Sequence, residues 1–151
     1  MKVFLDTNVW LSAVLFPGLC SELIVRCAEE DIVLLSSVLV HEEALAVLAR
    51  KFPQRSDTKA LFDASWQEAG CVADCAQPEG DNDARLVAAA ALADADLFIT
   101  GDARVLEWKT QGAMKIVSPR EAWGVLFSGS VAPSELDVGT ELVRHRLIFC
   151  R

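Results

Sequence analysis

The sequence lacks the cysteine pattern of a disulfide-stabilised secreted protein. Its five cysteines are an odd number, and their spacings do not form a disulfide framework. We therefore expect reduced thiols and a cytoplasmic location. Zinc ligation by Cys71 and Cys75 would need two further ligands, and His41 and His145 are the only histidines, so a zinc site is disfavoured.

Long apolar runs are also missing. The opening residues Met1–Leu5 resemble a signal peptide for five positions only, because Asp6 and Asn8 interrupt the apolar run. The longest clean run, Leu86–Ala93, is short and rich in alanine, whereas a membrane-spanning helix needs about 20 apolar residues. The sequence therefore predicts neither export nor a membrane span.

Positive charge is scarce as well. The chain has 14 Lys and Arg against 22 Asp and Glu, which gives a net charge of −8. A protein whose whole surface cradles nucleic acid is usually basic, so that class is disfavoured. An enzyme that brings metal ions to a carboxylate cleft can be acidic and still act on a polyanion. The 151 residues are 52% apolar, which predicts one domain with a buried core rather than a disordered chain.

Short β-like runs alternate with longer helical patterns. The expected strands are Val3–Leu5, Ile32–Leu35, Cys71–Ala73, Leu97–Thr100 and Lys115–Val117. The expected helices are Val9–Phe16, Ser21–Glu30, Ser37–Lys51, Ser56–Glu68, Asp81–Ala93, Ala103–Lys109 and Pro119–Phe127. This alternation predicts a single α/β domain, in which a parallel sheet is covered by helices on both faces in three α/β/α layers.

A change of composition divides the chain near residue 128. The stretch Ser128–Ser134 contains Gly129 and Pro133 and has the composition of a linker. We expect the domain to occupy residues 1–127 and a C-terminal extension of unassigned role to occupy residues 128–151. Its last part, residues 135–151, would be one more helix or an edge strand.

Three acidic residues follow the predicted strands. Ligands of open α/β sheets bind beyond the carboxyl ends of the strands. Asp6 directly follows the first strand, Asp102 lies two residues past Thr100, and Asp83 begins a helix after the loop that follows the third strand. If these strands are parallel neighbours, the three carboxylates converge on one edge of the sheet.

Helical spacing adds a fourth acid. Asp83 shares a helix face with Val87 and Ala90, so we expect it to point inward. Glu43 borders the apolar stripe of its helix, whereas Glu42 lies in the middle of the polar face. Several inward acids would take up protons unless a cation balanced them. Mg²⁺ or Mn²⁺ suits such an all-oxygen site and can activate a water for attack on phosphorus.

Four motifs, in order along the chain, resemble those of a PIN domain. They are Val3-Phe4-Leu5-Asp6-Thr7-Asn8-Val9, Glu43-x-x-x-Val47-Leu48, Asp83 before Val87–Ala90, and Phe98-Ile99-Thr100-Gly101-Asp102. The match covers about residues 1–127 and is most similar to the bacterial VapC-type toxins of toxin–antitoxin pairs. One departure is Asp94-Ala95, which stands where the family usually has a glycine before the Asp96 position.

The resemblance implies a metal-dependent endoribonuclease on a Rossmann-like sheet. The residues that match the family's Mg²⁺- or Mn²⁺-binding quartet are Asp6, Glu43, Asp83 and Asp102. Asn8 matches the residue that supports the first acid, and Thr100 matches a hydroxyl that hydrogen-bonds within the site. The resemblance further implies an RNA substrate, a homodimer and often a small antitoxin protein. The third acid stays open, because Glu79 and Asp81 lie close to Asp83 and Asp81 is an alternative ligand.

Other interpretations remain. Asp6, Asn8 and Asp102 could act as helix caps, Asp83 could complement a helix dipole, and Glu43 could be solvated. A PIN fold could also be a catalytically silent binding module. A phosphatase of the haloacid dehalogenase type is disfavoured, because Asn8 replaces the second aspartate of its first motif.

Several other residues have ordinary expected roles. We expect His41 to be packed rather than catalytic. We expect the tryptophans in the core or an interface: Trp10, Trp66, Trp108 and Trp123. The best basic cluster, which is either a solvated face or an RNA contact, is Arg50, Lys51, Arg55 and Lys59.

Overall fold

A computed structural model describes residues 1–75, 81–129 and 132. Within them, six strands form one sheet in the order β3-β2-β1-β4-β6-β5. The strands are β1 Lys2–Leu5, β2 Val33–Ser37, β3 Gly70–Val72, β4 Leu97–Ile99, β5 Thr110–Gln111 and β6 Met114–Val117. Every neighbouring pair is parallel except β5 and β6. The α/β fold with a mostly parallel sheet is therefore confirmed.

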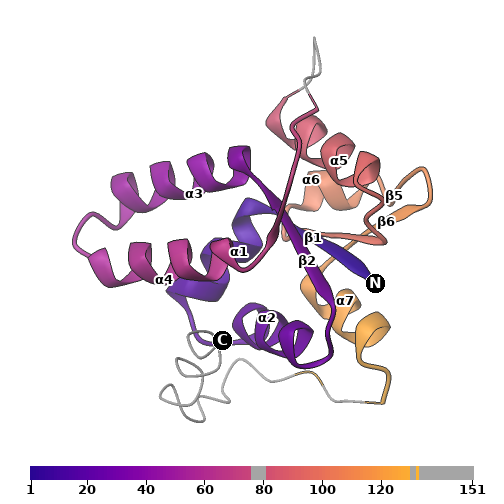
Figure 1. The fold of residues 1–151 in the computed structure, drawn as a ribbon, viewed down its shortest axis with the longest axis horizontal. Coiled ribbons are helices and arrows are strands. Elements are labelled where there is room, and N and C mark those ends of the chain that lie inside the picture. The colour runs from indigo at the N-terminus through magenta and orange to yellow at the C-terminus, as the bar shows by residue number, and fades with distance from the viewer. Residues whose placement is uncertain (76–80, 130–131, 133–151) are drawn as a thin grey trace.

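Helices flank this sheet. They are α1 Thr7–Leu15, α2 Leu19–Glu29, α3 Val38–Lys51, α4 Ser56–Gln67, α5 Asn82–Leu92, α6 Ala103–Leu106 and α7 Pro119–Leu126. Helices α1 and α2 pack on each other, α2 also contacts α7, and α1 contacts α3 and α4. Helices α5 and α6 lie together on the other side of the strands (Figure 1).

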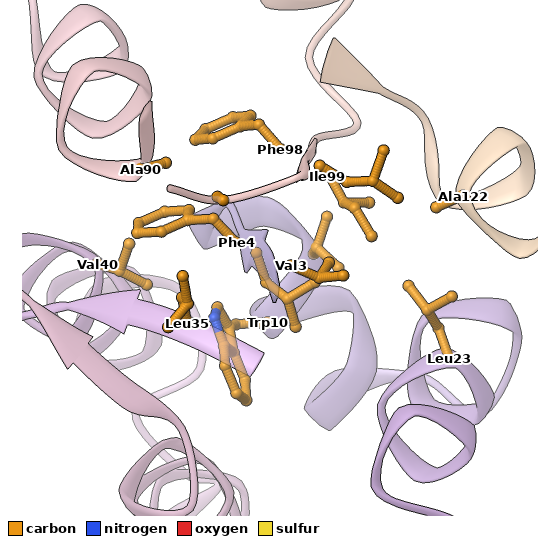
Figure 2. Close-up of a cluster of buried hydrophobic side chains, with 14 of the residues drawn as sticks. Val3, Phe4, Trp10, Leu23, Leu35, Val40, Ala90, Phe98, Ile99 and Ala122 are labelled. Carbon is orange, nitrogen blue, oxygen red and sulfur yellow. The ribbon is translucent and has the colours of Figure 1, made fainter. Parts of the chain in front are cut away.

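The two central strands form the middle of the core. Phe4 of β1 and Phe98 of β4 are partners in register, and their rings stack with centroids 5.3 Å apart. They lie beside Ala90 of α5, whereas Val3 and Ile99 point toward the opposite layer of helices (Figure 2). All five residues are at most 1% exposed. Because both faces are covered, these strands are apolar throughout, as is typical of parallel sheets.

Helix starts agree with local sequence signals. Ser37 caps α3, because its hydroxyl accepts a hydrogen bond from the amide of Val40 at 3.4 Å. Pro119 occupies the first turn of α7 after the capping residue Ser118. The Pro17-Gly18 break separates α1 from α2, as predicted.

The segment after β4 corrects one prediction. The helix expected over Ala103–Lys109 ends at Leu106, and residues Thr110–Gln111 instead form β5, antiparallel to β6. Lys109 and Gly112 have positive φ angles of 62° and 60°. Such left-handed residues end a helix and permit a tight turn.

Aromatic residues mostly occupy the predicted interior. Trp10 and Trp123 are buried, and Trp66 packs partly against the core. Trp108 is 43% exposed and therefore lies outside the core, which leaves an interface as its expected role. His41 is packed as expected: its ring stacks on Phe62 and contacts Trp66 at a tilt, and its Nε2 lies 2.8 Å from Asp63 Oδ1.

Some expectations fall outside the described residues. These are the helix or edge strand over residues 135–151, Glu79, His145 and Cys150. Among the described helices, none is by itself long and apolar enough to cross a membrane. The pair α1 and α2, bent by 101°, passes that test together by length and composition only.

Candidate functional site

Asp6 lies where β1 ends and α1 begins. Its amide donates to the carbonyl of Ile99 at 2.9 Å, which continues the pairing of β1 with β4. Its carboxylate Oδ1 accepts from the amide of Thr7 at 2.7 Å and caps α1. Asp6 is nevertheless only 3% exposed. The residue is therefore a helix cap and also a buried acid at the carboxyl edge of the sheet.

Asn8 and Thr100 hold the other oxygen of Asp6. Oδ2 accepts from Thr100 Oγ1 at 2.7 Å and from Asn8 Nδ2 at 3.0 Å. Asn8 Oδ1 accepts from the amide of Gly101 at 2.8 Å, and Thr100 Oγ1 accepts from the amide of Asp102 at 3.0 Å. These bonds tie the end of β1 to the end of β4. Both residues that the sequence assigned beside the first acid thus contact it.

The environment of Asp6 disfavours its charged form. Burial is the main cause that raises the pKa of its carboxyl from the ordinary 3.8 to about 6, and the charges of Asp83 and Glu43 act in the same direction. The hydrogen bonds from Thr100 and Thr7 lower this pKa and do not offset burial. The charges of two other acids therefore add to the burial that disfavours an ionised Asp6.

Glu43 reaches the site from α3. Its Oε2 accepts from Thr7 Oγ1 at 2.7 Å, and its Oε1 accepts from Asn82 Nδ2 at 2.7 Å. Because Thr7 begins α1 and Asn82 begins α5, Glu43 joins three helices. The sequence analysis preferred Glu43 to Glu42 as a site residue; Glu42 is exposed, whereas Glu43 is partly buried.

Asp83 and Asp102 share one arginine. Arg104 Nη2 lies 3.2 Å from Asp83 Oδ2 and 3.0 Å from Asp102 Oδ2. Burial raises the pKa of Asp83, as do the charges of Asp81 and Asp102. Hydrogen bonds from the side chain and backbone of Arg104 hold the pKa of Asp102 below its ordinary value. Each acid's side chain is 27% exposed, so this pair forms the outer part of the cluster.

Asp81 and Asp83 have different roles in the geometry. Asp81 is exposed, and its Oδ1 caps α5 by accepting from the amide of Ala84 at 2.9 Å. Asp83 interacts electrostatically with Asp6, Glu43 and Asp102, and also with Asp81. Asp83 therefore belongs to the group of interacting acids, and the helix cap accounts for the placement of Asp81.

The donor chemistry of the cluster fits a hard divalent ion. All four acids, Asp6, Glu43, Asp83 and Asp102, offer only oxygens, which suits Mg²⁺ or Mn²⁺. Within the ranges that the structure describes, no three side chains of Asp, Glu, His or Cys are placed to share one ion. Glu43 accepts hydrogen bonds from Thr7 and Asn82, and Asp83 and Asp102 both contact Arg104. Arg104 would have to move before Asp83 and Asp102 could share an ion.

Three residues that contact the acids were not predicted from the sequence. They are Thr7, Asn82 and Arg104. Thr7 lies inside the Asp-Thr-Asn motif and Asn82 directly precedes Asp83, so adjacency to the acids was the available signal. Arg104 is two residues after Asp102, and no periodicity predicts its pairing with Asp83.

The basic cluster lies away from the acids. Arg50 and Lys51 end α3, Arg55 precedes α4, and Lys59 lies in its first turn. All four are exposed. Since Arg50 follows Glu43 by seven positions along α3, about 10 Å of helix lies between them.

The fold and the site define an α/β protein with acids gathered at the carboxyl ends of parallel strands. The family model of the PIN domain matches residues 2–104, and the chain therefore belongs to the PIN domain family. PIN domains are a family of nucleases that typically depend on divalent metal ions. No curated protein and no solved structure matches the chain. The matched range contains all four acids of the cluster.

Proposed function

We propose that the protein is a metal-dependent endoribonuclease, the toxin of a VapC-type toxin–antitoxin pair. The observation that carries this proposal is the buried Asp6, whose pKa is raised to about 6 by burial and by the neighbouring acids Asp83 and Glu43. Retaining three mutually repelling carboxylates costs stability unless a cation balances them. Membership of a nuclease family supports phosphodiester chemistry at this position.

The four acids of the cluster would hold one or two Mg²⁺ or Mn²⁺ ions. A bound ion supplies an activated water for in-line attack on an RNA phosphodiester and neutralises the developing charge. Asn8 and Thr100 fix the orientation of Asp6 through its Oδ2. Thr7 and Asn82 fix both oxygens of Glu43. Such hydrogen bonds orient the ligands of a metal ion.

The substrate would lie over the open side of the acids. A hollow of about 360 Å³ lined by Asn8, Gly101 and Asp102 opens beside the cluster. The basic cluster at the α3–α4 turn would bind the RNA backbone further along, because exposed Arg and Lys contact phosphates without reading sequence. The toxin role, a homodimer and an antitoxin partner rest on the motif resemblance, and a cytoplasmic location rests on the cysteine pattern.

The second candidate is a binding module that holds RNA and cleaves nothing. The three acids turned toward other partners favour it, since they are not arranged around one ion. A phosphatase of the haloacid dehalogenase type is disfavoured, because Asn8 stands where that class has its general acid and an amide cannot supply the proton.

Cleavage of an end-labelled, mixed-sequence single-stranded RNA tests the proposal. We expect cleavage with Mn²⁺, none with chelator, and a loss of about 100-fold or more in Asp83→Ala. Asp81→Ala is the matched control, since its carboxylate caps α5, and it should keep its activity while losing about 1 kcal/mol of stability. Binding of the RNA without cleavage would favour the silent module. Activity that survives in Asp83→Ala and is lost in Asp81→Ala would move the third ligand to Asp81.

A further inference from the structure

We propose that Arg104 changes partner when a divalent ion binds: it leaves Asp83 and Asp102 and contacts a phosphate of the RNA beside the ion. This inference rests on the proposed function of the acid cluster. It adds a substrate-contacting residue that neither the motifs nor the family match assigns.

Arg104 occupies the side of the acids that faces solvent. Its side chain is 75% exposed, while the side chains of Asp83 and Asp102 are each 27% exposed. Its Nη2 contacts both carboxylates, and its Nε lies 3.4 Å from Asp102 Oδ1. The guanidinium therefore lies over the outer oxygens from the open side, where an incoming ion and its substrate must also approach.

The guanidinium and an ion would compete for the same oxygens. Asp83 Oδ2 and both oxygens of Asp102 accept hydrogen bonds from Arg104. An exposed ion pair contributes little to stability, in the range of about 0–1 kcal/mol. A divalent ion carries twice the charge and prefers carboxylate oxygens. The ion therefore displaces Arg104, and Arg104 lowers the apparent affinity of the acids for the ion.

The displaced arginine would stay close to the ion. Its backbone is fixed in the first turn of α6, and its amide donates to Asp102 Oδ1 at 2.8 Å. A phosphate bound to the ion would lie on the same open side, because Asp6 and the sheet edge close the other side. A guanidinium presents a planar fork of donors that matches phosphate oxygens. The chain's net charge of −8 repels RNA, and a positive side chain beside the ion would offset part of that repulsion.

Two binding measurements, neither of which depends on RNA cleavage, test whether Arg104 moves from the carboxylates to a phosphate. The first is calorimetric titration of Mn²⁺ alone into the wild type, Arg104→Gln and Arg26→Gln. Arg26 is a matched control, since this residue of α2 forms an ion pair at 3.1 Å with Glu30, which directly follows the helix. We expect Arg104→Gln to bind Mn²⁺ about two- to tenfold more tightly and Arg26→Gln to bind it as the wild type does. Unchanged or weaker Mn²⁺ binding by Arg104→Gln overturns the proposal.

The second measurement is the salt dependence of RNA binding. Anisotropy of an end-labelled single-stranded RNA is followed in Ca²⁺, and a gel afterwards shows that the RNA is intact. We expect Arg104→Gln to lower the log–log salt slope by about 0.7, the value of one phosphate contact on a single strand. Arg104→Lys should keep the slope, because it keeps the charge, and Arg26→Gln should not change it. If Arg104→Gln shows the same salt slope as the wild type, the proposed contact between Arg104 and a phosphate is wrong.

The two proposals fail in different ways. If the wild type cleaves RNA and Arg104→Gln gives neither effect, the nuclease stands and the exchange of partners is wrong. If the wild type does not cleave but both effects occur, Arg104 acts in a binding module. If neither Arg104→Gln nor the wild type binds Mn²⁺, both proposals fall.

Discussion

Two opposing influences act on Asp6. Three donors, the amide of Thr7 and the side chains of Asn8 and Thr100, stabilise its ionised form. Burial and the charges of Asp83 and Glu43 act against that form, and the net result is a pKa of about 6. Without a metal ion, the folded protein near neutral pH therefore contains an ionised acid that burial disfavours.

Replacing Asp6 by Asn should stabilise the protein in chelator near pH 7.5. The folded pKa of Asp6 is raised above the unfolded value, so the stability that this carboxyl contributes is fully present below about pH 4 and is lost as pH rises through about 6. A shift from 3.8 to about 6 corresponds to at most about 3 kcal/mol. We expect a gain of about 1–2 kcal/mol for Asp6→Asn, because the new amide opposes the Asn8 donor.

Chemical denaturation in chelator at pH 4 and pH 7.5 measures this difference. The advantage of Asp6→Asn should be absent at pH 4. With saturating Mn²⁺ the order should reverse, because only the wild type gains the free energy of ion binding. An Asp6→Asn variant less stable than the wild type in chelator at pH 7.5 would show that the cluster is not strained.

Thr7 is a positioning residue for Glu43. Its hydroxyl donates to Glu43 Oε2 at 2.7 Å, and the residue is 9% exposed. Thr7→Val keeps the branched shape and removes the donor. We expect it to lower the affinity for Mn²⁺ and the rate of RNA cleavage by about 10–100-fold, whereas Thr7→Ser should retain both. If Thr7→Val bound Mn²⁺ with the same affinity as the wild type, this role would be refuted.

At the scale of elements, helices were predictable and the shortest strand was not. Periodicity and capping residues such as Ser37 and Pro119 give a helix several independent signals in the sequence. The strand β5 has two residues, Thr110 and Gln111, which is too short for an alternating pattern. Its formation depends on pairing with β6, a tertiary contact that local propensity does not report.

The end of α5 offers a test of backbone geometry. Asp94 has a φ of 57°, and the amides of Asp94 and Ala95 donate to Ala91 and Ala90 at 3.1 Å. This left-handed position follows the last turn of the helix, where glycine is favoured. It also lies in the stretch where the resemblance implied a glycine.

Asp94→Gly should therefore stabilise the protein by about 0.5–1 kcal/mol, since it removes the strain of a left-handed side chain. Asp94→Ala removes the carboxylate while retaining the strain, and it should be neutral or destabilising. Urea denaturation of the three proteins checks the order, and a glycine variant no more stable than the wild type contradicts it.

At the scale of the whole molecule, the parallel sheet gathers residues that are distant in sequence. Strands β1 and β4 are neighbours, so the segment after Leu5 meets the segment after Ile99. The rule that ligands bind at the carboxyl ends of such strands was enough to predict this edge from the sequence. The partners of the acids were not predictable, because Thr7 and Glu43 are 36 positions apart and Arg104 and Asp83 are 21 apart. Side-chain pairing between elements depends on packing, which sequence spacing does not specify.

A diffraction experiment on crystals soaked in Mn²⁺, with an anomalous difference map, tests the central claim directly. The claim is that the acids Asp6, Glu43, Asp83 and Asp102 hold a divalent ion. We predict a Mn²⁺ peak among carboxylate oxygens of these residues, with the guanidinium of Arg104 moved away from Asp83. A map that shows no peak there at saturating Mn²⁺, with Arg104 still on Asp83 and Asp102, would contradict the account.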